Sequence, residues 1–357
     1  MNDLARLAPG RKLELTRFDH IPEALLDISA SDLWRLLPGP SLFRIPGRRA
    51  DPLFVTVLLH GNEDTGLTAV QEVLRRRRDS LLPRPLIMLV GNIDAAAAGV
   101  RTLPGQIDYN RCWPGTADPN SAEAGIMREV TDLVAAERPF ASIDIHNNTG
   151  NNPHYACVNR LDEPFLHLAR LFSHTVIYFE KPVGVQSAAM ALHCPSITIE
   201  CGRPGVAAGT AHAAELIEAA LSLSHFPEHP VPEGDVDILQ TFAILKVPGE
   251  ASFSFDGSDA DIRLRADLDH LNFSELEPGA SFGRIADGGG QRLIVAPGAD
   301  HETGGDLDSY FSYQGGDITL ARPAVPAMLT LDPNAVRLDC LGYLMHRIGR
   351  DGRPAAT

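Results

Sequence analysis

The sequence predicts an α/β fold followed by a smaller β-rich region, and three observations support that prediction. Short apolar runs alternate with helix-patterned segments over about 170 residues, which is typical of a sheet covered on both faces. A proline-rich stretch, SHFPEHPVPEGDVD at 224–237, then interrupts the pattern. Beyond it, short strand-like runs are separated by turn residues. We therefore expect an α/β/α sandwich with a mixed central sheet, and a smaller C-terminal β-rich domain.

Each expected strand of the first region is a short apolar run. These runs are Leu53–Leu59, Leu86–Val90, Ser142–Ile145, Thr175–Phe179 and Ser196–Ile199. Helical periodicity predicts helices at Thr65–Arg78, Ala122–Ala136 and Val206–Ser224. The strands expected in the second region are Phe242–Val247, Ile262–Leu264, Arg292–Val295 and Leu338–Met345. The expected domains are therefore 1–235, with a core at 52–224, and 236–357.

Composition argues against several classes of protein. The 357 residues include 31 Lys and Arg against 46 Asp and Glu, a formal net charge of −15. This charge repels phosphate backbones and anionic bilayers, so we expect no nucleic-acid partner and no membrane partner. No apolar run approaches the roughly 18 residues of a transmembrane helix, and Met1–Lys12 contains no apolar export segment. With five cysteines and no CxxC motif, we expect reduced thiols and a cytoplasmic location.

Polar motifs follow the expected strands directly, where α/β sheets bind their ligands. HGNE places His60 and Glu63 after the first strand, and DIHNNTG places His146 at a later strand end, with Asp144 two residues before it. Two histidines and one glutamate form a zinc set that leaves one position open for water. Asp144 is a candidate to accept a hydrogen bond from a ligand. Taken alone, each motif also fits a surface turn or a polar strand end.

Two further motifs offer acid–base and anion-binding groups. Glu200 closes the apolar strand ITIE, and a carboxylate beside metal-activated water can take its proton and pass it to a leaving amine. Arg101 and the segment DYNRCWPG, which contains Asn110 and Arg111, offer groups that bind carboxylates or stabilise an oxyanion. The alternatives are a glutamate that points into solvent and a loop with surface arginines.

Together the motifs resemble a known family. HGNE, N-x8-R, DYNRCWPG, DIHNNTG and ITIECG occur in the order typical of the succinylglutamate desuccinylase/aspartoacylase branch of the M14 zinc carboxypeptidase superfamily. The resemblance covers roughly 52–224 and implies a zinc-carboxypeptidase-like α/β/α fold. It also implies that one Zn²⁺ ion is held by His60, Glu63 and His146.

The same resemblance implies roles for the remaining candidates. Glu200 would be the general base, Arg101 would polarise the scissile carbonyl, and Asn110 and Arg111 would bind a substrate carboxylate. The implied enzyme is a zinc-dependent hydrolase that uses metal-activated water. Its substrate would be the amide bond of a small N-acyl amino acid or a related carboxylate-bearing molecule.

One stretch departs from that family. Counting back from Glu200, Gln186 and Met190 stand where aspartoacylases resemble one another in having tyrosine and arginine that hold a second carboxylate. The departure disfavours a dicarboxylic substrate such as N-acetylaspartate.

Other interpretations stay open. The chain is also compatible with a metallocarboxypeptidase that trims peptides, or with a catalytically silent relative that binds a metal or a ligand. Histidine and carboxylate ligands favour zinc but also suit other divalent ions. The expected partner is a small-molecule amide substrate, and a homo-oligomer is left open.

Several residues outside the motifs are expected to be structural. His154 and Tyr155 are expected to be packing residues, with a place in the pocket wall as the alternative. His212 is expected to be solvated on its helix. Cys194 and Cys201 are expected to be inert, buried thiols.

Overall fold

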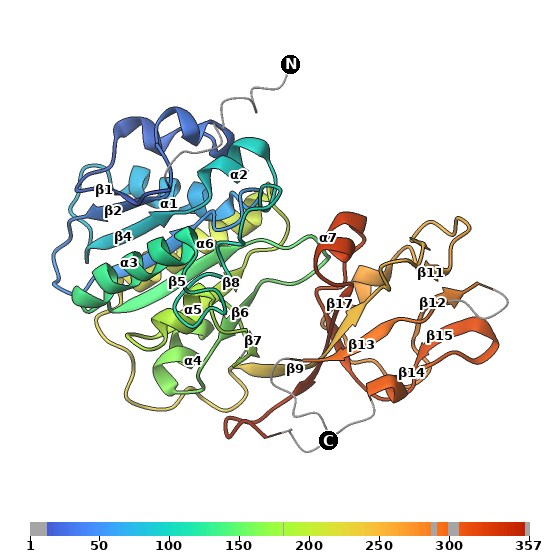
Figure 1. The fold of residues 1–357 in the computed structure, drawn as a ribbon. Helices are drawn as coiled ribbons and strands as arrows, with labels where there is room; N and C mark the ends of the chain where they lie inside the picture. Colours follow the sequence, from blue (N-terminus) through green and yellow to red (C-terminus); the bar gives the residue numbers. More distant parts are fainter. Residues whose placement is uncertain (1–12, 181, 287–290, 299–306, 354–357) are drawn as a thin grey trace. The chain divides into compact units, whose positions relative to one another are not determined.

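The computed structural model describes residues 13–180, 182–286, 291–298 and 307–353 (Figure 1). The chain divides into two compact units. The first unit contains residues 1–147, 154–176 and 182–236, and the second contains 148–153, 177–181 and 237–357. Two short segments that precede residue 235 therefore belong to the second unit, whereas the sequence predicts a single division after residue 235.

The first unit is built on strands of a mixed sheet in the order β1-β2-β4-β3-β5-β8-β6-β7, of which β7 contributes only Thr175 and Val176 to this unit. These strands are β1 (Thr16–Phe18), β2 (Ser41–Ile45), β3 (Leu53–Val57), β4 (Leu86–Val90), β5 (Ala141–His146), β6 (Tyr155–Val158), β7 (Thr175–Tyr178) and β8 (Ser196–Glu200). β3 is parallel to β4 and β5, and β5 is parallel to β8. Strand β2 runs antiparallel to β4, and β6 runs antiparallel to β8. The apolar strands β3 and β4 are buried along their whole length, as central parallel strands require.

Helices cover both faces of this sheet (Figure 1). They are α1 (Thr65–Arg76), α2 (Ile93–Ala98), α3 (Ala122–Ala136), α4 (Glu163–Arg170), α5 (Gln186–Met190) and α6 (Ala207–Ser222), with short 3₁₀ turns at Glu23–Leu26 and Ala30–Arg35. On one face, Gly66 of α1 lies against Ile145 of β5. On the other, Gln186 of α5 donates to Ser142 of the same strand. Since residues three apart on a strand face opposite sides, α1 and α5 cover opposite faces, and the predicted α/β/α sandwich is confirmed.

The second unit is rich in β-structure, as the sequence predicts. Strand β9 (Asp237–Lys246) pairs antiparallel with β13 (Ile294–Pro297) and with β17 (Gly342–Arg347), and β17 pairs antiparallel with β16 (Val325–Ala327). A five-stranded sheet contains β10 (Phe253–Ser254), β11 (Ile262–Leu264), β12 (Ser281–Ile285), β14 (Phe311–Ser312) and β15 (Asp317–Leu320). The hydrophobic core of the second unit includes the buried residues Phe242, Phe282 and Leu344.

One prediction about the chain needs correction, and another concerns residues that the structure does not describe. The strand expected at Leu338–Met345 begins at Gly342, because Leu338 ends helix α7 (Pro333–Leu338), whose first turn is capped by Asp332. The expected lack of an export segment concerns Met1–Lys12, which lie outside the described residues. Among the residues that are described, no helix is both long enough and apolar enough to cross a bilayer.

Candidate metal centre

The candidate centre lies at the carboxyl ends of three neighbouring parallel strands, β3, β5 and β8. After β3 the chain turns through Leu58, whose φ of 56° is left-handed, and reaches His60. Gly61 follows at a point where a Cβ atom would lie 2.2 Å from the backbone of α2, so the turn requires glycine. His146 ends β5 and Glu200 ends β8, and the strand register pairs these two residues.

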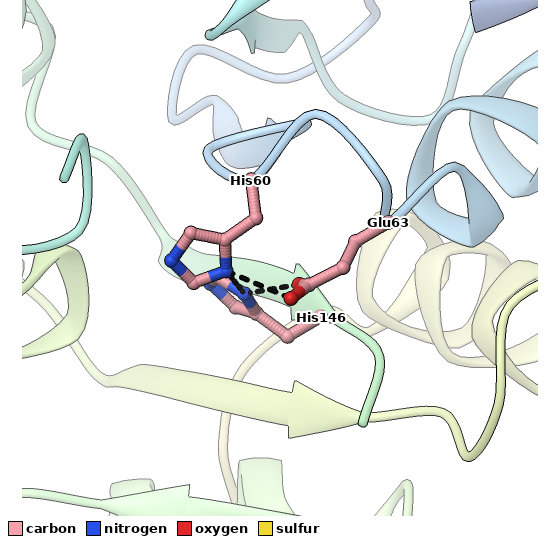
Figure 2. Close-up of side chains that lie close together, drawn as sticks. All are labelled: His60, Glu63 and His146. Carbon is pink, nitrogen blue, oxygen red and sulfur yellow. Dashed lines mark hydrogen bonds and ion pairs between the residues drawn. The ribbon is translucent and has the colours of Figure 1, made fainter. Parts of the chain in front are cut away.

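Three side chains from two separate segments converge at this point (Figure 2). Nδ1 of His146 lies 3.1 Å from Nδ1 of His60 and 2.7 Å from Oε2 of Glu63. Nδ1 of His60 lies 2.9 Å from Oε1 of Glu63. All three residues are buried, and their ligand atoms lie within 4.8 Å of one another. Across the part of the chain that the structure describes, this is the one group of three or more His, Cys, Asp or Glu side chains so arranged.

A carboxylate lies behind each imidazole. Oδ1 of Asp108 is 3.1 Å from Nε2 of His60, and Oδ2 of Asp144 is 2.7 Å from Nε2 of His146. The Thr56 hydroxyl donates to the other oxygen of Asp144. A carboxylate at Nε2 favours the tautomer that carries its proton there, which leaves the Nδ1 lone pair free for the centre.

The electrostatics of the centre are governed by these carboxylates. Burial alone would raise the pKa of Glu63, but His60 and His146 hold that pKa well below its usual range. Burial alone would lower the pKa of His146, but Asp144 and Glu63 raise it well above its usual value. Burial also opposes ionisation of Asp108, yet the contact with His60 keeps its pKa low. Three buried or partly buried carboxylates therefore gather around two imidazoles, a balance of charge that favours a bound cation.

The donor set fits Zn²⁺. Zinc takes imidazole nitrogen and carboxylate oxygen at about 2.0–2.2 Å, which places donors bound to one ion roughly 3–3.5 Å apart. The separations of 2.7, 2.9 and 3.1 Å among His60, Glu63 and His146 are close to that range. Three protein ligands of this kind leave a position for water or substrate, as catalytic zinc sites do.

Glu200 and Arg101 border the centre. Glu200 is half-buried and, as the strand partner of His146, presents its side chain on the same face of the sheet. Nη2 of Arg101 lies 2.9 Å from Oδ2 of Asp108, and its Nη1 lies 3.8 Å from Oε1 of Glu63. The Arg101 side chain remains 37% exposed, so a molecule that enters from solvent can reach it.

The two residues predicted to bind a carboxylate lie in different surroundings. Arg111 is exposed, and its Nη1 donates to the Asn110 carbonyl at 2.8 Å. Asn110 is buried, with Nδ2 3.2 Å from Oδ2 of Asp144 and 3.1 Å from Nε2 of His146. Its Oδ1 accepts a hydrogen bond from the backbone N–H of Gln186 at 2.9 Å. Both polar atoms of the Asn110 side chain are therefore engaged with residues around His146.

The stretch that departs from the family is closed to solvent. Gln186 and Met190 both have an exposed fraction of 0%. Nε2 of Gln186 donates to the Ser142 hydroxyl at 2.7 Å, so this amide points into the protein. Neither side chain offers an exposed charge to a ligand.

Two residues were missed as parts of the site. Asp108 belongs to a motif that stands out in the sequence, but its contact with His60 joins residues 48 positions apart and has no local signal. Asn147 follows His146 directly, donates through its backbone to Glu63 at 3.2 Å, and donates through Nδ2 to the Gly202 carbonyl at 2.8 Å. The position of Asn147 next to the predicted metal ligand His146 is the sequence signal that could have identified it.

Comparisons with known proteins concern the sequence of the first unit and the fold. Residues 52–224 match the sequence profile described as the succinylglutamate desuccinylase/aspartoacylase catalytic domain. A succinylglutamate desuccinylase/aspartoacylase from Rhodobacter sphaeroides has a similar structure, with a TM-score of 0.57 at 15% identity over 85% of this chain and 88% of the other. Murine aminoacylase 3 gives a TM-score of 0.55 at 16% identity, over 84% and 96%. The succinylglutamate desuccinylase from Chromobacterium violaceum gives 0.50 at 20% identity, over 71% and 86%.

No curated protein matches the chain in sequence. Residues 52–224, just under half of the chain, nevertheless match the catalytic-domain profile of the succinylglutamate desuccinylase/aspartoacylase family, and the similar structures share the fold. The resemblance predicted from the ordered motifs is therefore confirmed.

Proposed function

We propose that this protein is a zinc-dependent hydrolase that cleaves the amide bond of a small N-acyl amino acid or a related carboxylate-bearing substrate. The observation that carries the proposal is the convergence of His60, Glu63 and His146, with Glu200 paired to His146 across the sheet. The family match supports it, as do similar structures that are named as desuccinylases and an aminoacylase.

Each residue has a place in the proposed reaction. Zn²⁺ held by the two histidines and Glu63 would acidify a water molecule and polarise the substrate carbonyl. Glu200 accepts the proton of the attacking water and returns it to the departing amine. Arg101, which lies near Glu63 and reaches solvent, stabilises the negative charge that develops on the carbonyl oxygen.

Substrate binding is assigned to the exposed side of the same loop. Arg111 binds the substrate carboxylate, because its guanidinium reaches solvent one residue from Asn110. Asn110 supplies a second donor when its Nδ2 leaves Asp144 and His146. Fixing the carboxylate in this way sets the register of the scissile bond and reduces the entropic part of the barrier.

The proposed substrate has one carboxylate. Gln186 and Met190 are buried and uncharged, so they offer no positive charge to bind a second substrate carboxylate. We therefore expect N-acyl amino acids with neutral side chains to be hydrolysed with higher kcat/KM than N-acylaspartates. A matched panel of N-acetylated amino acids measures this preference, and equal or better hydrolysis of N-acetylaspartate would contradict it.

The central test combines metal analysis with turnover of Glu200→Gln. The purified protein should contain one zinc per chain and hydrolyse members of an N-acyl amino acid library. Glu200→Gln should keep its zinc but lose about 10²- to 10⁴-fold in kcat, the usual contribution of a positioned general base. Glu215→Gln, an exposed glutamate on α6, is the matched control and should behave as the wild type.

Three outcomes would contradict the proposal. An unchanged kcat in Glu200→Gln would remove this residue from the reaction. Turnover of C-terminal peptide bonds but of no N-acyl amino acid would make the protein a carboxypeptidase. Full zinc content without hydrolysis of any amide would indicate a binding protein.

A further inference from the structure

A second pair of histidines lies in the first unit, apart from the candidate metal centre. His154 precedes β6, and His212 lies in the second turn of α6. Their Nδ1 atoms are 2.8 Å apart, although the residues are 58 positions apart in sequence. Both residues are half-buried, so the prediction that His212 is simply solvated is wrong. Its helix faces His154, and the tertiary fold brings the two rings together.

The pair is held in place by its neighbours. The Phe172 ring stacks on His212 with centroids 4.2 Å apart and on His154 with centroids 6.0 Å apart. Gly202 adopts a φ of +72°, and a Cβ atom there would lie 3.4 Å from Nε2 of His154. The Ser173 hydroxyl donates to the His154 carbonyl at 2.9 Å. The two imidazoles are therefore oriented before any ligand arrives, which reduces the entropic cost of binding.

The protonation chemistry of the pair suits a metal ligand. A hydrogen bond between two Nδ1 atoms requires that one of them carries no proton. Burial lowers the pKa of His154, and the neighbouring His212 lowers it further. His154 is therefore neutral at pH 7, the form in which imidazole binds metal ions.

The spacing of the pair also suits a metal ion. Two nitrogens 2.8 Å apart can occupy adjacent positions around one ion at metal–nitrogen distances of about 2.0–2.1 Å. Among the described residues, the grouping of three or more ligands includes neither His154 nor His212, so water would complete the coordination. Imidazole donors select Zn²⁺, Ni²⁺ and Cu²⁺ over Mg²⁺ and Ca²⁺, which prefer oxygen.

We propose that His154 and His212 form a second, weaker site for a divalent transition-metal ion. The site shares no residue with the centre formed by His60, Glu63 and His146, and its partial exposure gives an ion access from solvent. The pair lies beside the turn at Gly202, two residues after Glu200, where a Cβ atom would be 3.4 Å from Nε2 of His154. Metal in excess of one equivalent therefore occupies this pair.

The test is a Zn²⁺ titration of the protein already loaded with one equivalent of zinc. Calorimetry and equilibrium dialysis measure the binding. The wild type should bind a second equivalent. In His212→Ala the second event should weaken at least about tenfold, while the first equivalent is retained. His225→Ala, an exposed histidine beyond α6, is the matched control and should bind as the wild type does.

A second variant and a second probe protect the test against misfolding. His154→Gln removes the other ligand and should weaken the same event. In the protein already loaded with zinc, Cu²⁺ bound at the pair should show coupling to two imidazole nitrogens in electron paramagnetic resonance, and this two-nitrogen signal should be lost in both variants. A wild type that stops at one equivalent, or a second event that survives in both variants, overturns the proposal.

The result is distinguishable from a failure of the proposed hydrolase. His146→Ala should lose the tight event and keep the weak one, whereas His212→Ala should do the reverse. A tight event that survives in His146→Ala counts against the proposed catalytic centre alone. A weak event that survives in His212→Ala and His154→Gln counts against the second site alone.

Discussion

Two histidine pairs in the same unit present the same donor atoms in different surroundings. The Nδ1 atoms are 3.1 Å apart in the pair of His60 and His146, and 2.8 Å apart in the pair of His154 and His212. The first pair is buried and faces a glutamate, with an aspartate behind each ring. The second is half-buried, with the Phe172 ring stacked on His212 and Gly202 beside His154.

The two pairs differ in the carboxylates around the first, which reverse the pKa shift that burial alone would cause. In the first pair, Asp144 and Glu63 overcome burial and raise the pKa of His146. In the second, burial and a neighbouring imidazole lower the pKa of His154. Negative charge around the first pair compensates a divalent ion, so we expect tight binding there and weak binding at the second.

The largest expected effect comes from removing a ligand of the first pair. His146→Ala should weaken zinc binding by more than the roughly 100-fold that loss of a supporting hydrogen bond can cost, and should abolish hydrolysis. Elemental analysis after dialysis and the N-acyl amino acid assay measure both effects. His154→Ala is the control and should retain one tightly bound zinc. Full zinc occupancy in His146→Ala would show that this histidine is not a ligand.

A smaller effect is expected from the carboxylate behind His60. Asp108→Asn keeps an oxygen near Nε2 but removes the charge, and should weaken zinc binding about 10- to 100-fold. Competition with a chromophoric chelator measures the affinity. Asp132→Asn, on the exposed face of α3, should leave it unchanged. If Asp108→Asn also leaves it unchanged, the charge behind His60 does not explain the contrast between the two pairs.

The smallest effect concerns the pH dependence of stability at the second pair. In the folded protein the pKa of His154 lies below the ordinary value of 6.5, which applies to the unfolded chain. Between the folded and the unfolded pKa, the unfolded chain therefore binds more protons. The contribution of His154 to stability is therefore present above pH 6.5 and is lost as the pH falls towards its folded pKa. His154→Gln should lessen the decrease in unfolding free energy between roughly pH 7.5 and 5.5.

Denaturant unfolding at the two pH values measures this change, with His225→Gln as the exposed control. A decrease of the same size in His154→Gln and the wild type would show that this imidazole is not held in its neutral form by the fold.

Elements with complete local signals were predicted closely. The apolar run Leu86–Val90 is β4, and Ala122–Ala136 is α3, whose N-cap Ser121 accepts a hydrogen bond from the Ala124 N–H. Strand β6 and helix α5 were not predicted. Helix α5, with the sequence QSAAM, is too short to show a helical period. Strand β6, with the sequence YACV, has one β-branched residue, whereas the predicted strand β7, TVIY, has three.

The sequence by itself determined the α/β organisation and the residues that the structure gathers at the strand ends, His60, Glu63 and His146. These follow from local order, because the ends of neighbouring parallel strands meet at one edge of a sheet. Tertiary structure alone decided that Asp108 lies behind His60, that Asn110 turns inward, and that His154 meets His212. The physical reason is that these contacts join residues 34 to 58 positions apart, and no local propensity encodes which distant side chain packing will bring into reach.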